Sequence, residues 1–191
     1  MSVIDELVGA NRAATESGGA GTASVPGKPT RAVAVVTCMD CRINVEQVLG
    51  LGPGEAHVLR NAGGVVTDDM IRSLALSQHK LGTREVMLIH HDQCGMTTVT
   101  DDAFRAELQE ATGVAPAFAI ESFADVEADV RQSIERVRRS PFIAHRDAVR
   151  GFVFDVDTGA LREVAAAAGG SGGPDPDRDG AAAQPPGEEV V

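Results

Sequence analysis

The most informative stretch of the sequence is Arg31-Ala-Val-Ala-Val-Val-Thr37, followed without a break by Cys38-Met-Asp-Cys-Arg42. The first part is a continuous apolar run with β-branched side chains. Such a run predicts a strand that is buried on both faces, as in a parallel sheet. The second part places thiol, carboxylate and guanidinium groups where that strand ends. Because open parallel sheets bind ligands beyond the carboxyl ends of their strands, this junction is a candidate functional site.

Outward from this strand, patterns typical of strands and helices alternate along the chain. Further strands are predicted over residues 57–60, 85–90 and 151–156, and residues 157–159 predict a hairpin into a last strand over 160–164. Helices are predicted over residues 2–11, 44–51, 68–81 and 123–137, the last from apolar residues spaced three and four apart. This order predicts an α/β fold, with a mainly parallel β-sheet flanked by helices, an N-terminal helical arm and a C-terminal strand and hairpin.

Two segments of different composition flank the predicted domain. Residues 1–30 join the first helix to a linker rich in Gly, Ser, Ala and Pro, and we expect this arm to reach across to a second subunit. Residues 31–165 are the predicted α/β domain. Residues 166–191 are poor in large apolar side chains and rich in Gly, Pro and Asp, so we expect a disordered acidic tail.

The bulk composition argues against several classes of protein. The 191 residues are 43% apolar, enough for one hydrophobic core, and the absence of Trp and Tyr leaves Val, Leu, Ile and Ala to fill it. The net charge is −11, of which residues 169–191 carry −4 through five carboxylates and one arginine. A chain this acidic, without a basic stripe, is not expected to bind nucleic acid. The first residues lack the long apolar run of a secretory signal or a membrane anchor, so no membrane association is expected.

The cysteines indicate a metal centre. Three cysteines are an odd number and predict no disulfide framework, and their nearness to His and Asp favours metal or redox chemistry in a cytoplasmic protein. Cys38 follows the first predicted strand and His91 the third, which brings both side chains to one edge of the sheet. Cys94 stands three residues after His91, a spacing at which a tight turn can bring both onto one ion. Two thiolates and one imidazole suit Zn²⁺, and three protein ligands leave a fourth position open for chemistry.

Asp40 and Arg42 are the candidate groups for moving a proton at this centre. Two thiolates neutralise the charge of Zn²⁺, so a bound water is acidified less than on an ion with neutral ligands, and a nearby group must manage its proton. An arginine fork against Asp40 would keep that carboxylate ionised and oriented. Asp40 held in this way could accept a hydrogen bond from zinc-bound hydroxide, or could itself swing onto the zinc.

Each of these residues also has an ordinary interpretation. A Cys at the end of a buried strand is most often a small core residue, and an Asp and an Arg two residues apart usually form an exposed pair of little energetic weight. Neighbouring residues at a strand end point to opposite sides, so we expect His90 to pack in the core while His91 faces the ion. The remaining histidines, His57, His79 and His145, show no partner pattern and are expected to be structural or exposed.

Together these motifs resemble the β-class carbonic anhydrases, in the compact form of the bacterial branch. The family pattern is Cys-x-Asp-x-Arg after the first strand and His-x-x-Cys-Gly after a later one. These stand here as Cys38-Met-Asp-Cys-Arg42 and His91-Asp-Gln-Cys-Gly95. The resemblance continues through Arg60-Asn-Ala-Gly-Gly64, Thr67-Asp-Asp69 and Arg150-Gly-Phe-Val-Phe-Asp155, and covers roughly residues 33–164.

The resemblance implies an enzyme that hydrates carbon dioxide reversibly to bicarbonate and a proton, through attack by zinc-bound hydroxide. It implies Cys38, His91 and Cys94 as the zinc ligands and Asp40 with Arg42 as a catalytic dyad. It also makes Asp40 an optional fourth ligand in a resting state.

The same resemblance implies a homodimer or a dimer of dimers, with N-terminal helices that cross between subunits and active sites near the interface. The residues expected to line the substrate pocket or that interface are Asn61, Ala62, Gly63, Gly64 and Gly95.

Position 41 departs from the family, which usually carries Ala or Ser there. Cys41 creates a Cys38-x-x-Cys41 spacing. In one interpretation, Cys41 replaces another small residue and points away. In the other, it oxidises with Cys38, which ejects the zinc and makes the activity redox-sensitive.

Three alternative functions stay open from the sequence. A thiol–disulfide oxidoreductase also carries Cys-x-x-Cys after a first strand, but it leaves His91, Cys94 and the Asp40–Arg42 pair unexplained. The same fold acting on carbonyl sulfide or carbon disulfide would have the same motifs and a different cavity shape. A protein that holds zinc without turnover is disfavoured by an intact Asp–Arg pair beside the ligands.

Overall fold

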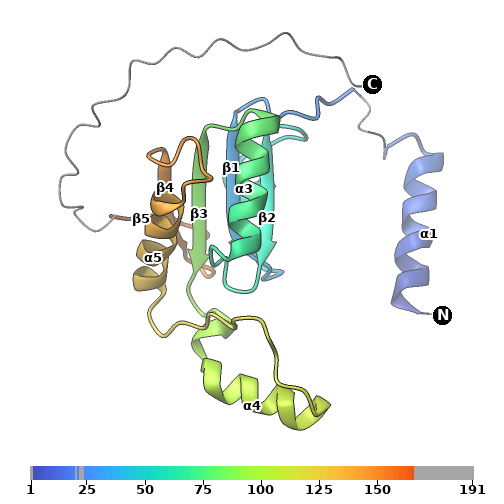
Figure 1. The fold of residues 1–191 in the computed structure, drawn as a ribbon. Coiled ribbons are helices and arrows are strands. Elements are labelled where there is room, and N and C mark those ends of the chain that lie inside the picture. Colours follow the sequence, from blue (N-terminus) through green and yellow to red (C-terminus); the bar gives the residue numbers. More distant parts are fainter. Residues whose placement is uncertain (1, 20, 22–23, 166–191) are drawn as a thin grey trace, which may run out of the picture.

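Five strands form one sheet in the order β2-β1-β3-β4-β5 in the computed structural model (Figure 1). The structure describes residues 2–19, 21 and 24–165. The strands are β1 (Val33–Cys38), β2 (Ala56–Asn61), β3 (Glu85–His91), β4 (Val149–Phe154) and β5 (Leu161–Val164). The first four pair in parallel and β5 is antiparallel to β4, which confirms the predicted mainly parallel sheet with a C-terminal hairpin. The predicted disordered tail, residues 166–191, lies outside the described residues.

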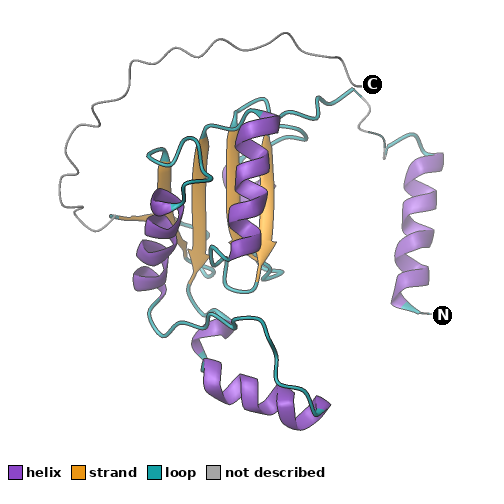
Figure 2. Cartoon of the chain, in the orientation of Figure 1, coloured by secondary structure: helices purple, strands orange, loops and turns teal. Residues whose placement is uncertain are grey.

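Two long helices cover one face of the sheet (Figure 2). The α-helices are α1 (Val3–Glu16), α2 (Val45–Leu49), α3 (Asp68–Leu81), α4 (Asp101–Thr112) and α5 (Val126–Arg139). On the covered face, Val36 and Leu88 of the central strands belong to one buried cluster with Leu74 of α3 and Ile134 of α5. Burial of such aliphatic side chains contributes about 1.5–3 kcal/mol each, so this layer provides much of the stability of the fold.

Helix ends were largely predictable because their capping residues are local. The Thr67 hydroxyl accepts from the Met70 amide at the start of α3, and Gly82 ends that helix with φ 78°. The prediction was wrong at Phe123, which precedes α5 even though its spacing fits the apolar stripe. Asp125 caps the helix by accepting from two backbone amides, so the chain ahead of it is not helical.

Helix α4 was not predicted. Thr100 caps it and Gly113 ends it with φ 76°, so both ends carry ordinary signals. Every residue of α4 is exposed or half-buried, and it therefore lacks the apolar stripe on which helix prediction depends. The helix lies beyond the carboxyl ends of the strands, away from the sheet (Figure 1).

The N-terminal helix is longer than predicted and stands apart from the sheet (Figure 1). Each of its residues is exposed, including Val3, Ile4 and Leu7, which are 65–71% accessible. Its predicted role as an arm that reaches a second subunit stays a prediction. Across residues 2–19, 21 and 24–165, the helices are too short or too polar for one of them to cross a membrane.

Candidate metal centre

Cys38, His91 and Cys94 converge at the carboxyl ends of β1 and β3. These strands are adjacent and parallel, with Thr37 paired to Ile89, so Cys38 and His91 leave the sheet side by side. Cys94 precedes the short 3₁₀ helix Gly95–Thr97, a tight turn that folds its thiol back towards His91. The three side chains are buried, and their ligand atoms all lie within 4.8 Å of one another.

The donor set fits zinc. On a tetrahedral Zn²⁺ with bonds of about 2.0–2.3 Å, neighbouring ligand atoms stand about 3.3–3.8 Å apart, which small side-chain shifts in this cluster would reach. Both ring nitrogens of His91 are buried without a hydrogen-bond partner among the described residues. Since buried polar atoms are normally satisfied, a metal bond to one nitrogen would account for half of that deficit.

Cys38 and Cys94 shift each other's pKa because their thiols are in contact. A hydrogen bond from Cys94, with further ones from the backbone amides of Asp40 and Gly63, lowers the pKa of Cys38 to about 4. The hydrogen bond and negative charge of Cys38 in turn raise the pKa of Cys94. One thiol is therefore already poised as a thiolate, and a bound dication would displace the remaining protons.

Asp40 and Arg42 lie beside this cluster as a bidentate pair. The Arg42 Nε donates to Asp40 Oδ1 at 3.0 Å and its Nη2 donates to Oδ2 at 2.7 Å. The Arg42 backbone amide adds a third bond to Oδ1 at 2.9 Å. The Arg42 side chain and amide hold the pKa of Asp40 well below its usual range, so this carboxylate is ionised at neutral pH. Its Oδ2 lies 3.8 Å from His91 Nε2, which places a fixed negative charge next to the ligand atoms.

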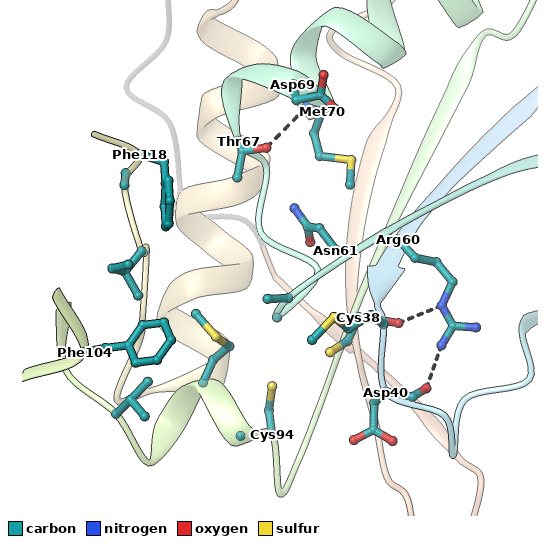
Figure 3. A pocket seen from close by; sticks show the side chains of 18 residues that line it. Cys38, Asp40, Arg60, Asn61, Thr67, Asp69, Met70, Cys94, Phe104 and Phe118 are labelled. Atoms are coloured by element: carbon teal, nitrogen blue, oxygen red, sulfur yellow. Dashed lines mark hydrogen bonds between the residues drawn. The ribbon is translucent and has the colours of Figure 1, made fainter. Parts of the chain in front are cut away.

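Arg60 fixes the backbone of the loop that carries Cys38 and Asp40. Its Nε donates to the Cys38 carbonyl oxygen at 2.9 Å and its Nη2 to the Asp40 carbonyl oxygen at 2.6 Å (Figure 3). No role was predicted for Arg60 from the sequence. The available signal was its position near the end of the strand predicted over residues 57–60.

The loop at residues 61–64 has two glycines in a left-handed backbone conformation. Gly63 and Gly64 have φ 79° and 75°, in the region that favours glycine. A Cβ at Gly64 would stand 3.0 Å from the Cys38 amide nitrogen, so only glycine lets the loop pack against the first ligand. The Asn61 side-chain amide donates to the Val65 carbonyl oxygen at 2.8 Å and closes the turn.

A cavity of about 720 Å³ opens onto the cluster. Its polar side carries Cys38, Asp40 and Arg60, and Phe104 and Phe118 face them across the cavity (Figure 3). The predicted pocket residues Asn61, Ala62, Gly63 and Gly95 line it, whereas Gly64 packs against the Cys38 backbone. The apolar wall of the cavity was not predicted, because neither α4 nor the turn that follows it was predicted. This wall consists of Met96, Val99, Phe104, Phe118 and Ile120.

His90 packs away from the cluster, as predicted. Its Nε2 lies 2.6 Å from Asp129 Oδ2, and its ring lies 5.7 Å from that of Phe123. Two other histidines have structural contacts: His57 with the Ser77 hydroxyl and His79 with the Phe142 carbonyl oxygen.

Comparison with known proteins agrees with these features. The carbonic anhydrase family profile matches residues 33–161. Beta-carbonic anhydrase 1 of Mycobacterium tuberculosis is 51% identical over 164 residues, which cover 86% of this chain and 99% of that protein. The chain belongs to the β-carbonic anhydrase family. A carbonic anhydrase structure from Streptococcus mutans superimposes with a TM-score of 0.79 at 44% identity, over 86% of this chain and 99% of the other.

This carbonic anhydrase also has relatives named for another substrate. Carbon disulfide hydrolase of Acidianus sp. is 33% identical over 153 residues, covering 68% of this chain and 75% of that protein. Membership of the family identifies the chain as an enzyme of the zinc-dependent carbonic anhydrases. It leaves no support for the thiol–disulfide oxidoreductase alternative.

Proposed function

We propose that this chain catalyses the zinc-dependent, reversible hydration of carbon dioxide to bicarbonate and a proton. The observation that carries the proposal is the buried Cys38–His91–Cys94 cluster, with ligand atoms within 4.8 Å of one another, in a chain of this family. When bound there, zinc acts as a Lewis acid that makes water a nucleophile at neutral pH.

The dyad orients the reacting water in this proposal. Asp40 is held ionised and in one orientation by Arg42, and its Oδ2 stands 3.8 Å from the candidate ligand atom of His91. A water beside the cluster can therefore donate one hydrogen bond to Asp40, which directs a lone pair into the cavity. In a resting state Asp40 could instead leave Arg42 and serve as an additional ligand, beside Cys38, His91 and Cys94.

The apolar wall suits a small substrate without charge. Phe104 and Phe118 present apolar rings to the side of the cavity opposite Asp40, where a substrate without charge needs no polar partner. Carbon disulfide is also linear and apolar, and the relatives named for it make it the second candidate substrate.

Zinc-loaded protein should hydrate carbon dioxide at least about a hundredfold faster than it hydrolyses carbon disulfide. This ratio corresponds to a difference of about 2.7 kcal/mol in transition-state binding. Stopped-flow pH-indicator assays measure the first reaction and sulfide release measures the second, on one metal-analysed preparation. Faster turnover of carbon disulfide would reverse the assignment of substrate. Absence of both activities at alkaline pH, with zinc bound, would favour a zinc-holding protein without turnover.

We further propose that residues 1–30 are a dimerisation arm, residues 31–165 the catalytic domain, and the assembly a homodimer or a dimer of dimers in the cytoplasm. The apolar side chains Val3, Ile4 and Leu7 support this, since an exposed apolar stripe on α1 is suited to a second copy of the chain. The three cysteines are free thiols in the described structure, which suits a reducing compartment.

We also propose that Cys41 makes the enzyme redox-sensitive. Cys41 is exposed and lies three residues after the buried Cys38, whose lowered pKa favours the thiolate. A peroxide would oxidise the two thiols to a disulfide and be reduced to water, and zinc would leave with the loss of Cys38. Oxidised wild type should lose most of its zinc and activity and regain both with a dithiol and zinc, whereas Cys41→Ser should resist. Retention of zinc and activity by the oxidised wild type would refute this role.

A further inference from the structure

Arg42 is held by a second residue besides Asp40. Its Nη2 donates to the Gln93 carbonyl oxygen at 3.1 Å and its Nη1 donates to Gln93 Oε1 at 3.3 Å. The side-chain amide of Gln93 then donates from Nε2 to Asp157 Oδ2 at 3.1 Å. Three separate segments are connected in this way: the loop after β1, the loop after β3, and the hairpin between β4 and β5.

The backbone on both sides of this connection is fixed. Gln93 has φ 52°, a conformation that is costly for a residue with a side chain and persists only where the surroundings impose it. Its neighbour Asp92 donates its amide to the Phe154 carbonyl oxygen at 3.1 Å and accepts from the Val156 amide at 3.0 Å. On the hairpin, Asp155 accepts from the Asp157 amide at 3.0 Å. The contacts of Gln93 thus join two anchored loops.

Asp157 determines which end of the Gln93 amide faces Arg42. An ionised carboxylate accepts hydrogen bonds only, so it binds the NH₂ group and leaves Oε1 directed at the guanidinium. In the reverse orientation two donor groups would oppose each other at Arg42, and two acceptors at Asp157. The exposed aspartate therefore acts on the pair through Gln93.

The hydrogen bonds of Arg42 show how Gln93 restrains its guanidinium. Of the five N–H groups of the guanidinium, Asp40 accepts from one on Nε and one on Nη2, and Gln93 accepts from one on Nη1 and one on Nη2. The Arg42 side chain is 44% accessible, so without Gln93 it would be restrained by Asp40 alone. With Gln93, the guanidinium keeps its place even while Asp40 is away from it.

We propose that Gln93 and Asp157 are positioning residues that hold Arg42 in the orientation in which it fixes Asp40. This inference rests on the proposed function of the Asp40–Arg42 pair and extends it to two residues whose identity the family motif does not specify. Neither residue touches the reacting atoms, and both act through Arg42.

In zinc-loaded protein, Gln93→Leu should lower kcat/KM for carbon dioxide hydration about three- to tenfold, the loss expected for charge-assisted bonds at a partly exposed site. Zinc content should stay unchanged. Asp157→Ala should lower kcat/KM less than Gln93→Leu does. It should have no further effect in the Gln93→Leu background, because the two residues act in series. Thr158→Ala, in the same hairpin, is the matched control and should behave as wild type.

Exchanging the donor and the acceptor between positions 93 and 157 distinguishes a positioning role from a general effect on stability. Gln93→Glu alone places two carboxylates together and should lower kcat/KM, whereas Gln93→Glu combined with Asp157→Asn restores the bond with its polarity reversed and should restore the rate to within about twofold. An NMR readout that does not depend on turnover is rotation about the Arg42 Cζ–Nη bonds, with the signals assigned through Arg42→Lys. Rotation should be slow in the wild type and in the double variant, and faster in Gln93→Leu.

Unchanged rotation and unchanged kcat/KM in Gln93→Leu would overturn the inference, and so would failure of the double variant to recover. Asp40→Asn in the same series separates this result from the proposed function. If Asp40→Asn is inactive while Gln93→Leu behaves as wild type, the positioning role alone is wrong. If Asp40→Asn keeps full activity, the role of the Asp40–Arg42 pair is wrong and the positioning role with it.

Discussion

Replacement of Cys94 by alanine should reduce bound zinc from about one ion per chain to less than about a tenth, and carbon dioxide hydration by at least about a hundredfold. Even residues that only orient a zinc ligand change affinity or activity by about 10–100-fold, so the loss of a ligand must exceed that. Two remaining ligands, Cys38 and His91, cannot close a tetrahedral site. Metal analysis after dialysis and a stopped-flow hydration assay measure the two effects.

Cys41→Ala is the matched control, because it removes an exposed thiol near the same centre. Under reducing conditions it should keep its zinc and its activity. Circular dichroism distinguishes loss of metal from loss of fold, and Cys94→Ser, which is closer in size, provides a second variant if the alanine protein is unstable. Stoichiometric zinc in a folded Cys94 variant would show that the cluster has been assigned to the wrong residues.

The placement of the candidate ligands followed from the sequence because it depends on short-range patterns. The apolar run at residues 33–37 identifies a buried parallel strand, and parallel strands in one sheet end at a common edge. Cys38 and His91 were therefore expected at one edge of the sheet, and they lie close together because β1 and β3 are adjacent strands. Helix α3 was equally predictable, since Thr67 and Gly82 mark its ends locally.

The apolar side of the cavity could not be predicted in this way. Helix α4 has no core-facing stripe, and Phe118 and Ile120 reach the cavity only because the chain turns back after that helix. Asp101 stabilises the turn by accepting from the Ser122 amide at 2.8 Å, a contact between residues 21 positions apart. Long-range contacts of this kind leave no periodic signal. The same holds for Arg60 and Gln93, each of which contacts the end of β1 or the segment after it through two hydrogen bonds.

Replacement of Asp40 by asparagine should leave zinc bound and lower kcat by about a hundred- to ten-thousandfold, the usual contribution of a positioned acid–base group. Asparagine keeps the size of the side chain but has no charge and can accept from Arg42 through one oxygen only. The loss should fall on kcat more than on KM, because the carboxylate acts on the reacting water and makes no contact that an uncharged substrate needs for binding. Asp68→Asn, at an exposed carboxylate that pairs with Arg136, is the matched control and should keep full activity.

The charge of Asp40 should also affect the free energy of unfolding, which can be measured without any turnover. Arg42 holds the pKa of Asp40 below that of an unfolded aspartate, about 3.9, so the ionised side chain stabilises the folded state above that pH and loses this effect as the pH falls. Asp40→Asn should therefore be less stable than wild type in urea at pH 7, and the difference should shrink below about pH 3.9, where the carboxylate is protonated in the unfolded wild-type chain but still ionised in the folded one. A difference that is constant from pH 7 to pH 3 would mean that the charge of Asp40 contributes nothing to its hold on Arg42. The orientation of the carboxylate would then have to come from the loop backbone that Arg60 fixes.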